Sequence, residues 1–117
     1  MRRFIYVLMA VIIFGIASCS KSMTQYDNEI SLAEMIMRNN TDSALSLLDE
    51  IDPSELEIDS LRAKYHYLKG WGHLSGNRSM VGDSLIGYAH NFYRGKDIVR
   101  NIRSGIVFAW YKFWVGD

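Results

Sequence analysis

Apolar residues recur with the period of an α-helix in four stretches between residues 26 and 92. In the first stretch they are four, three and four residues apart, which places the apolar side chains on one helix face. The four sets are Tyr26, Ile30, Ala33 and Met37; Ala44, Leu47, Leu48 and Ile51; Leu61, Tyr65, Leu68 and Gly72; and Leu85, Ala89 and Phe92. No stretch alternates between apolar and polar residues as a half-buried strand does. The sequence therefore predicts an all-α fold.

Polar residues separate the four predicted helices. The breaks are expected at Asn39-Asn40, at Asp52-Pro53 and over residues 76–82. Pro53 favours a single helical turn, which Asp52 and Glu55 would close as a capping box. Three Asp-Ser pairs precede helical stretches, and their side-chain oxygens are suited to accept hydrogen bonds from the free N–H groups of a first turn. These pairs are Asp42-Ser43, Asp59-Ser60 and Asp83-Ser84.

The last stretch, residues 97–117, has the spacing of a fifth helix but an unusual composition. Its apolar stripe consists of Ile98, Ile102, Ile106, Trp110 and Phe113, and further aromatic residues leave it little polar face. Three hypotheses remain open for this segment. It folds back over the last helical pair, it forms a partner-binding surface, or it is a truncated or frame-shifted stretch that replaces further repeats.

The N-terminus combines a positive start with a short apolar run. Arg2 and Arg3 precede fourteen uncharged residues, 4–17, fewer than the ~20 that span a bilayer as a helix. Ile16-Ala17-Ser18-Cys19 follows directly and resembles the lipobox of bacterial lipoprotein signal peptides. This resemblance implies that residues 1–18 are removed and that Cys19 carries a diacylglycerol and an acyl chain such as palmitate. Residues 19–25 would then be the lipidated cysteine and a tether.

The lipobox resemblance also suggests a location. Ser20 follows the cysteine, in place of the aspartate that retains such lipoproteins in the inner membrane, so the outer membrane of the cell envelope is favoured. Cys19 is the only cysteine of the chain, so no disulfide framework is expected. The alternative is an ordinary secretory signal, or a short membrane helix, with an incidental cysteine.

The middle of the chain resembles divergent tetratricopeptide-type repeats. The resemblance is carried by residues 42–68, DSALSLLDEIDPSELEIDSLRAKYHYL, and extends roughly over residues 30–93. It implies antiparallel helix hairpins, two to two and a half units, over residues 26–96. Ala44, Leu48 and Ile51 would pack in one helix and Ala63 and Tyr67 in the next. The first helix lacks the tryptophan and glycine of the standard repeat.

The Asp-Ser pairs resemble a second motif, the short acceptor for O-glycosylation of exported bacterial proteins. This resemblance makes Ser43, Ser60 and Ser84 possible modification sites. A helix-capping role for the same residues requires no enzyme and is the simpler interpretation.

The charges are balanced overall but divided along the chain. The sequence has 13 basic and 13 acidic residues, with ten acidic residues against one basic residue between residues 27 and 59. From residue 60 onward, nine basic residues stand against three acidic ones. Because the basic residues are spread out and match no nucleic-acid motif, we expect the two halves to attract one another and no nucleic acid to bind.

No residue pattern indicates catalysis, a cofactor or a metal. His66 and His73 are seven residues apart and His90 lies on another predicted helix, without the spacing of metal ligands. Gly70, Gly72 and Gly76 match no phosphate-binding loop, and helix packing with a C-terminal stop explains them better. The acidic residues between 49 and 59 are interpreted as a solvated surface. We therefore expect no enzymatic activity.

The sequence thus predicts a lipid-anchored helical-repeat protein that acts as a scaffold and binds a protein or peptide. The expected contact residues are Tyr65, Tyr67, Trp71 and Tyr88, with burial in the core as the alternative for each. A second hypothesis is the extracytoplasmic sensor fragment of a longer membrane-bound regulator.

Overall fold

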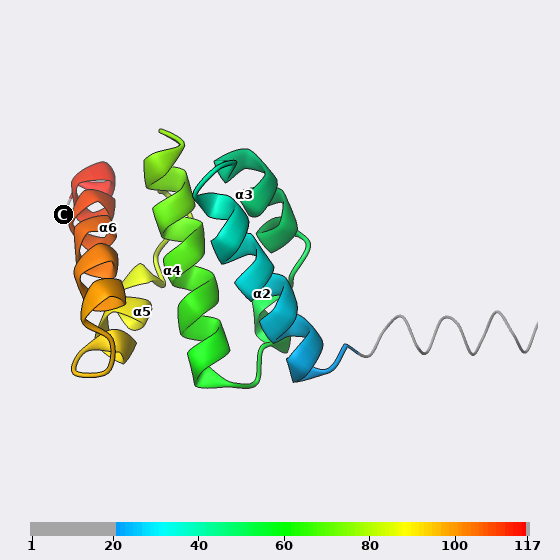
Figure 1. Ribbon diagram of the computed structural model, residues 1–117. Helices are drawn as coiled ribbons and strands as arrows, with labels where there is room; N and C mark the ends of the chain where they lie inside the picture. Colours follow the sequence, from blue (N-terminus) through cyan, green and yellow to red (C-terminus); the bar gives the residue numbers. More distant parts are fainter. Residues whose placement is uncertain (1–20, 117) are drawn as a thin grey trace, which may run out of the picture.

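The computed structural model describes residues 21–116, and within this range the protein is all-α, as predicted (Figure 1). No strand occurs among the described residues. The elements are α2 (Met23–Met37), α3 (Thr41–Asp49), the short 3₁₀ helix η1 (Pro53–Glu55), α4 (Asp59–Ser75), α5 (Ile86–Tyr93) and α6 (Ile98–Val115). The predicted signal segment 1–18 and Cys19 lie outside the described residues.

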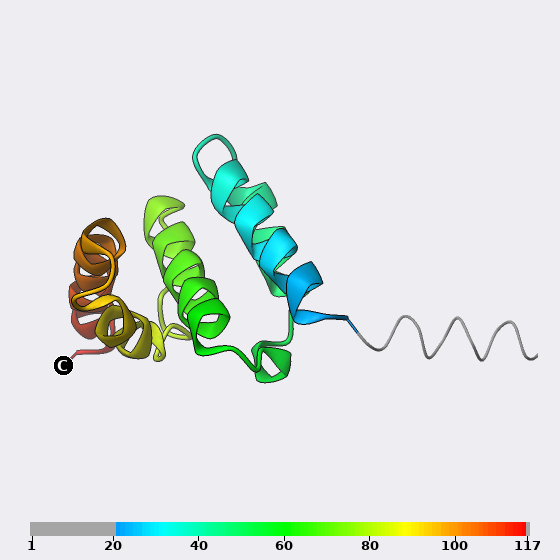
Figure 2. The same ribbon diagram turned by 60° about the horizontal axis from the view of Figure 1, so that its bottom comes forward.

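The helices form two antiparallel hairpins followed by a single helix. Helices α2 and α3 make the first hairpin and α4 and α5 the second, with α6 packed on the second. Helix α4 is central, with α2 and α3 on one side and α5 and α6 on the other (Figures 1 and 2). It contacts all four of the other α-helices among the described residues. The described chain therefore contains two and a half helical units, in agreement with the prediction.

The first helix begins earlier than the sequence suggested. The Ser22 hydroxyl oxygen accepts a hydrogen bond from the Gln25 backbone N–H at 3.2 Å. The Gln25 side chain in turn accepts one from the Ser22 N–H at 2.9 Å, which completes a capping box. Residues 23–25 are therefore helical, and the predicted tether over residues 19–25 was too long.

The Asp-Ser pairs do not cap the helices, and that prediction was wrong at all three places. Helix α3 is capped by Asn40, whose side-chain oxygen accepts a hydrogen bond from the Ser43 N–H at 3.1 Å. Helices α4 and α5 have no side-chain cap. Asp59 instead pairs with Arg62 at 2.8 Å, and the buried Asp83 contacts His73 at 2.8 Å.

The short helix η1 begins as predicted and is fastened to α2. The Asp52 carboxylate caps it by accepting a hydrogen bond from the Ser54 N–H at 3.0 Å. Glu55 does not close the predicted capping box but accepts a hydrogen bond from the Tyr26 hydroxyl. That hydrogen bond, with some help from burial, raises the pKa of Tyr26 to about 12.

In the four predicted helices between residues 26 and 92 the hydrophobic core follows the predicted stripes, except at Leu45 and Leu85. Tyr26, Ile30, Ala33 and Met37 of α2 are all buried. Leu45 is only 1% exposed although the predicted stripe omitted it. Leu85, predicted to be buried, is 51% exposed, and Ile86 is fully buried in its place. Helix α5 begins at Ile86, one residue after the predicted start of its stripe.

Glycines allow neighbouring helices to approach α4 closely, as predicted for Gly70 and Gly72. A Cβ atom added at Gly72 would lie 2.7 Å from Leu45 Cδ2, so the glycine makes room for the unpredicted core leucine. A Cβ atom at Gly70 would lie 2.7 Å from Val107 Cγ1 of α6. The prediction that these two glycines serve helix packing is confirmed.

Helix α6 packs on the second hairpin through the side opposite its apolar stripe. Its buried residues are Ser104 and Val107, and Phe108 lies against Gly87 of α5. Ile98, Ile102, Ile106, Trp110 and Phe113 are all exposed. The segment therefore covers the last helical pair, as one of the three hypotheses held, but with Ser104, Val107 and Phe108 and not with the predicted stripe.

Candidate protein-binding groove

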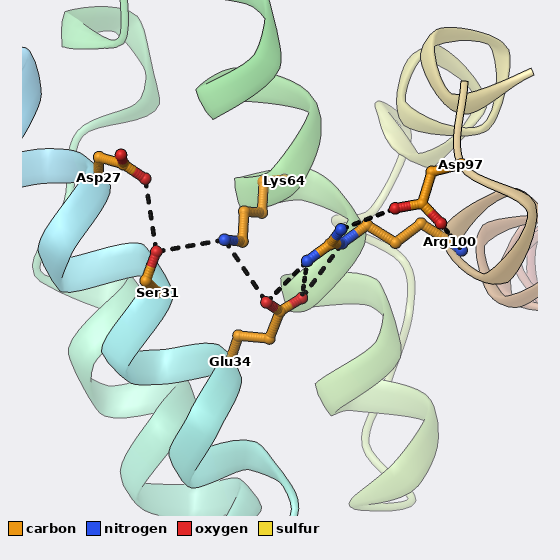
Figure 3. Close-up of polar contacts among 6 residues, drawn as sticks. All are labelled: Asp27, Ser31, Glu34, Lys64, Asp97 and Arg100. Carbon is orange, nitrogen blue, oxygen red and sulfur yellow. Dashed lines mark hydrogen bonds and ion pairs between the residues drawn. The ribbon is translucent and has the colours of Figure 1, made fainter.

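An ion-pair network joins α2, α4 and α6 on one face of the molecule (Figure 3). The Arg100 guanidinium of α6 donates to both carboxylate oxygens of Glu34 on α2, at 2.8 and 2.9 Å from Nη2. The Lys64 ammonium of α4 lies 3.4 Å from the same Glu34 carboxylate. A single carboxylate thus connects the first hairpin to α4 and to α6.

Helix α6 is oriented for this contact by its own N-cap. The Asp97 carboxylate accepts hydrogen bonds from the Arg100 backbone N–H at 3.0 Å and from Arg100 Nη1 at 2.7 Å. These two bonds, in that order, hold the pKa of Asp97 below its usual value. Burial acts to lower the pKa of Arg100, but the hydrogen bonds to Glu34 and Asp97 outweigh it and raise that pKa. Arg100 is therefore a fixed cation held between two carboxylates.

Two cavities open beside this network, and we call them together the α2–α4–α6 groove. The larger has a volume of about 590 Å³ and is lined by residues of α2, α4, α6 and its N-cap. The smaller has a volume of about 380 Å³ and lies at the start of α2 and α4. Arg100 lines both cavities, so both adjoin the network. The larger volume lies within the range of ordinary ligand pockets, about 300–1,000 Å³.

The larger cavity has two arginines and an aromatic ring on its walls. Arg103 of α6 lies over the Trp71 ring, with its guanidinium carbon 5.3 Å from the ring centroid. Arg38, at the end of α2, is exposed at the same cavity. Among residues 21–116, no carboxylate pairs with Arg38 or Arg103. The cavity therefore offers positive charge beside an apolar surface.

The four predicted contact residues fall in different places. Tyr65 and Tyr67 are buried in the core, the alternative that the sequence left open. Trp71 is half-buried and lines the larger cavity. Tyr88 is half-buried on α5, and its hydroxyl donates to the Asp59 carbonyl at 3.3 Å. Only Trp71 of the four presents a partly exposed ring to the groove.

The predicted modification sites are accessible where they are described. Ser43 lies in the first turn of α3, Ser60 in the first turn of α4, and Ser84 just before α5. All three serines are exposed. Cys19, the predicted lipidation site, lies outside the described residues.

The histidines serve internal contacts. His73 Nδ1 lies 2.8 Å from the Asp83 carboxylate, and His90 Nδ1 lies 3.1 Å from the Asn101 carbonyl oxygen. Burial lowers the pKa of His66, which stacks edge-on against Tyr65. No group of three metal-ligating side chains occurs within residues 21–116.

The sequence did not identify Glu34, Arg38, Arg100 or Arg103 as site residues. Glu34 and Arg100 are 66 positions apart, and neither belongs to a motif. The one available signal was the division of charge between the two halves of the chain. Among the described residues, five ion pairs join these halves, including Lys69 with Asp49 and Arg78 with Asp42, which confirms the predicted attraction.

The described helices contain none with the length and apolarity needed to cross a membrane. Comparison of the chain with protein-family models, with curated proteins and with solved structures finds no match. The groove therefore provides the chemical argument for function.

Proposed function

We propose that this protein is a lipid-anchored cell-envelope scaffold that binds an acidic segment of a partner protein in the α2–α4–α6 groove. The observation that carries the binding proposal is the pair of arginines, Arg38 and Arg103, that face the larger cavity without a carboxylate partner in residues 21–116. A bound carboxylate would supply that partner. Trp71 and Met35 would contact the apolar side chains of the same segment.

The groove suits a peptide better than a compact small molecule. Three helices form its walls, and its two cavities share Arg100, so an extended segment is the shape that reaches both. The fixed Glu34–Arg100 pair provides a polar floor to which a peptide backbone can hydrogen-bond. The anchoring part of the proposal rests on the lipobox resemblance that ends at Cys19.

The binding proposal is tested by selecting peptides from a random display library on the protein and measuring their affinity by fluorescence anisotropy. We expect the selected peptides to be rich in Asp and Glu and to bind more weakly as salt is added. Arg103→Glu should abolish binding. Lys112→Glu is the matched control, because Lys112 also lies over an aromatic ring of α6 but does not line the groove. Equal binding by the two variants would exclude the groove.

The anchoring proposal needs a separate measurement. Intact mass and membrane fractionation of the full chain are compared with those of Cys19→Ala. Wild type should be cut before Cys19, carry the mass of its acyl groups and remain with membranes, whereas the variant stays unprocessed. Identical behaviour of both chains, without lipid mass, would reject the anchor and leave the binding proposal intact.

A further inference from the structure

Helix α6 presents an uninterrupted apolar surface on the side that faces away from the rest of the protein. At 3.6 residues per turn, seven exposed residues without a charge share about one third of its circumference. We call this surface the α6 outer face, and it consists of Ile98, Val99, Ile102, Ile106, Ala109, Trp110 and Phe113. Ile98 and Phe113, near its two ends, are 79% and 76% exposed.

The size of the α6 outer face is typical of a surface that binds another molecule. From the exposed fractions of its side chains, the α6 outer face and the adjoining Trp114 leave on the order of 800 Å² of apolar surface in contact with water. The largest apolar patch of an ordinary monomer measures about 300–600 Å². A standard protein interface buries about 800 Å² on each partner. The α6 outer face together with Trp114 is thus large enough for one stable interface.

We propose that the occupant is the α6 outer face of a second copy of this protein, packed antiparallel about a two-fold axis near Ile106. The two ends of the face differ in character: the N-terminal half is aliphatic, with Ile98 and Ile102, and the C-terminal half is aromatic, with Trp110 and Phe113. An antiparallel two-fold arrangement sets each aliphatic half against the partner's aromatic half. Large and small side chains then interdigitate, as they do in well-packed cores.

The position of α6 at the edge of the molecule permits this two-fold pairing. Helix α6 lies at one edge of the molecule, and the hairpin of α2 and α3 lies at the opposite edge (Figures 1 and 2). A two-fold pairing of α6 is closed, so it produces a dimer and not a filament. The α6 outer face shares Val99 with the groove, and the other residues that line the larger cavity belong to α2, α4, the α6 N-cap and the side of α6 that carries Arg100 and Arg103.

A membrane is the less favoured occupant. The described chain begins at residue 21, two residues before α2, and α2 lies on the edge opposite α6 (Figure 1). Cys19 is two residues before Lys21, and a fully extended residue spans at most about 3.6 Å. A lipid on Cys19 would therefore draw α2 toward the bilayer and leave the α6 outer face directed away from it.

The dimer is tested by cysteine cross-linking of the full chain. Ile106→Cys places a thiol at the proposed axis, and Leu32→Cys on α2 is the matched control, since the two parent residues are 45% and 46% exposed. A short bis-maleimide is used because packed helix axes lie about 8–10 Å apart. The unsubstituted chain is the control for any reaction of Cys19 with the bis-maleimide.

We expect Ile106→Cys, but not Leu32→Cys, to shift most of the chain to a band of twice the monomer mass. Adding Phe113→Lys to Ile106→Cys should abolish the band, while circular dichroism shows the helices intact. Three results would overturn the proposal: equal cross-linking of both variants, a product that contains another protein, or protection of Ile106→Cys from a water-soluble maleimide without any dimer. The last result would indicate insertion into lipid.

Discussion

The packing of α6 on α4 is best tested at Gly70. A Cβ atom added there would lie 2.7 Å from Val107 Cγ1 of α6 and 3.2 Å from Ile86 Cδ1 of α5. The first distance is too short for two carbon atoms, so Gly70→Ala must displace α6 or force Val107 out of its preferred rotamer. Because both contacts lie between helices, the loss in the free energy of unfolding caused by Gly70→Ala shows whether α6 packs against α4.

The expected magnitude follows from two opposing effects. Overpacking of a core costs about 1–3 kcal/mol, whereas replacing a mid-helix glycine by alanine returns about 1 kcal/mol of helix propensity. Gly70→Ala should therefore lower the free energy of unfolding by about 1 kcal/mol. Val107→Ala removes two buried carbon atoms at about 0.8 kcal/mol each, so it should cost about 2 kcal/mol once the small cavity is included.

The double variant distinguishes a specific contact from general damage. In Gly70→Ala/Val107→Ala the new methyl group occupies space that Val107 leaves, so the clash disappears and the propensity gain remains. We expect the double variant to be about 2 kcal/mol more stable than the sum of the single effects predicts, a coupling typical of residues in contact.

Urea denaturation followed by circular dichroism measures these differences, with the denaturant slope checked for constancy. Gly82→Ala is the control, because a Cβ atom at Gly82 meets nothing within 4 Å. It should be neutral or slightly stabilising. Additive effects of Gly70→Ala and Val107→Ala would refute the packing of α6 described above.

Two further predictions concern helix caps. Asn40→Ala should lower the free energy of unfolding by about 1 kcal/mol in urea titrations, whereas Asn39→Ala should not, because the Asn39 side chain makes no hydrogen bond to the described residues. Asp97→Asn should destabilise the protein at neutral pH, since the carboxylate loses its charge beside Arg100. Because the folded pKa of Asp97 lies below its ordinary 3.8, this advantage of wild type is complete above pH 3.8 and disappears as the pH falls through the folded pKa. If the urea midpoints of wild type and Asp97→Asn differed by the same amount at pH 7 and at pH 2, this assignment would be contradicted.

The helices were predictable because their apolar period is local. Tyr26, Ile30 and Ala33 lie on one face whatever the rest of the chain does, and the structure buries all three. Leu45 and Leu85 were misjudged because their burial depends on partners. Leu45 is buried since Gly72, on another helix, leaves space for it. No spacing within α3 reveals that space.

Helix α6 shows that a regular apolar period does not always identify the buried face of a helix. Its most regular apolar stripe, which includes Ile102 and Ile106, points outward, while Ser104 and Val107 are buried. Val107 and Phe108 lie against Gly70 and Gly87, so the packing side is chosen by its fit to the glycines of the neighbouring helices and not by apolarity alone. The glycines of the neighbouring helices were the only sequence signal for this choice.

The groove was less accessible to sequence reasoning than the fold, because it depends on charges that are far apart in the chain. Glu34 and Arg100 belong to different helices, and only folding makes them neighbours. Trp71 was singled out for its ring, but Arg103, which lies over that ring, was not. A lone arginine carries no periodicity, so its role appears only when its surroundings are known.

The same charges determine what the groove can do. Half-exposed ion pairs such as Glu34–Arg100 contribute only about 0–1 kcal/mol to stability, so the packing of Val107 and Phe108 against the second hairpin contributes more to the seating of α6 than this pair does. The pair acts on the groove instead: it neutralises Arg100 and fixes the positions of α2 and α6 relative to each other. Arg38 and Arg103 are left as the positive charges that face the larger cavity. Charge selection and helix packing are therefore separate, and Arg103→Glu should abolish binding of the acidic segment without unfolding the helices.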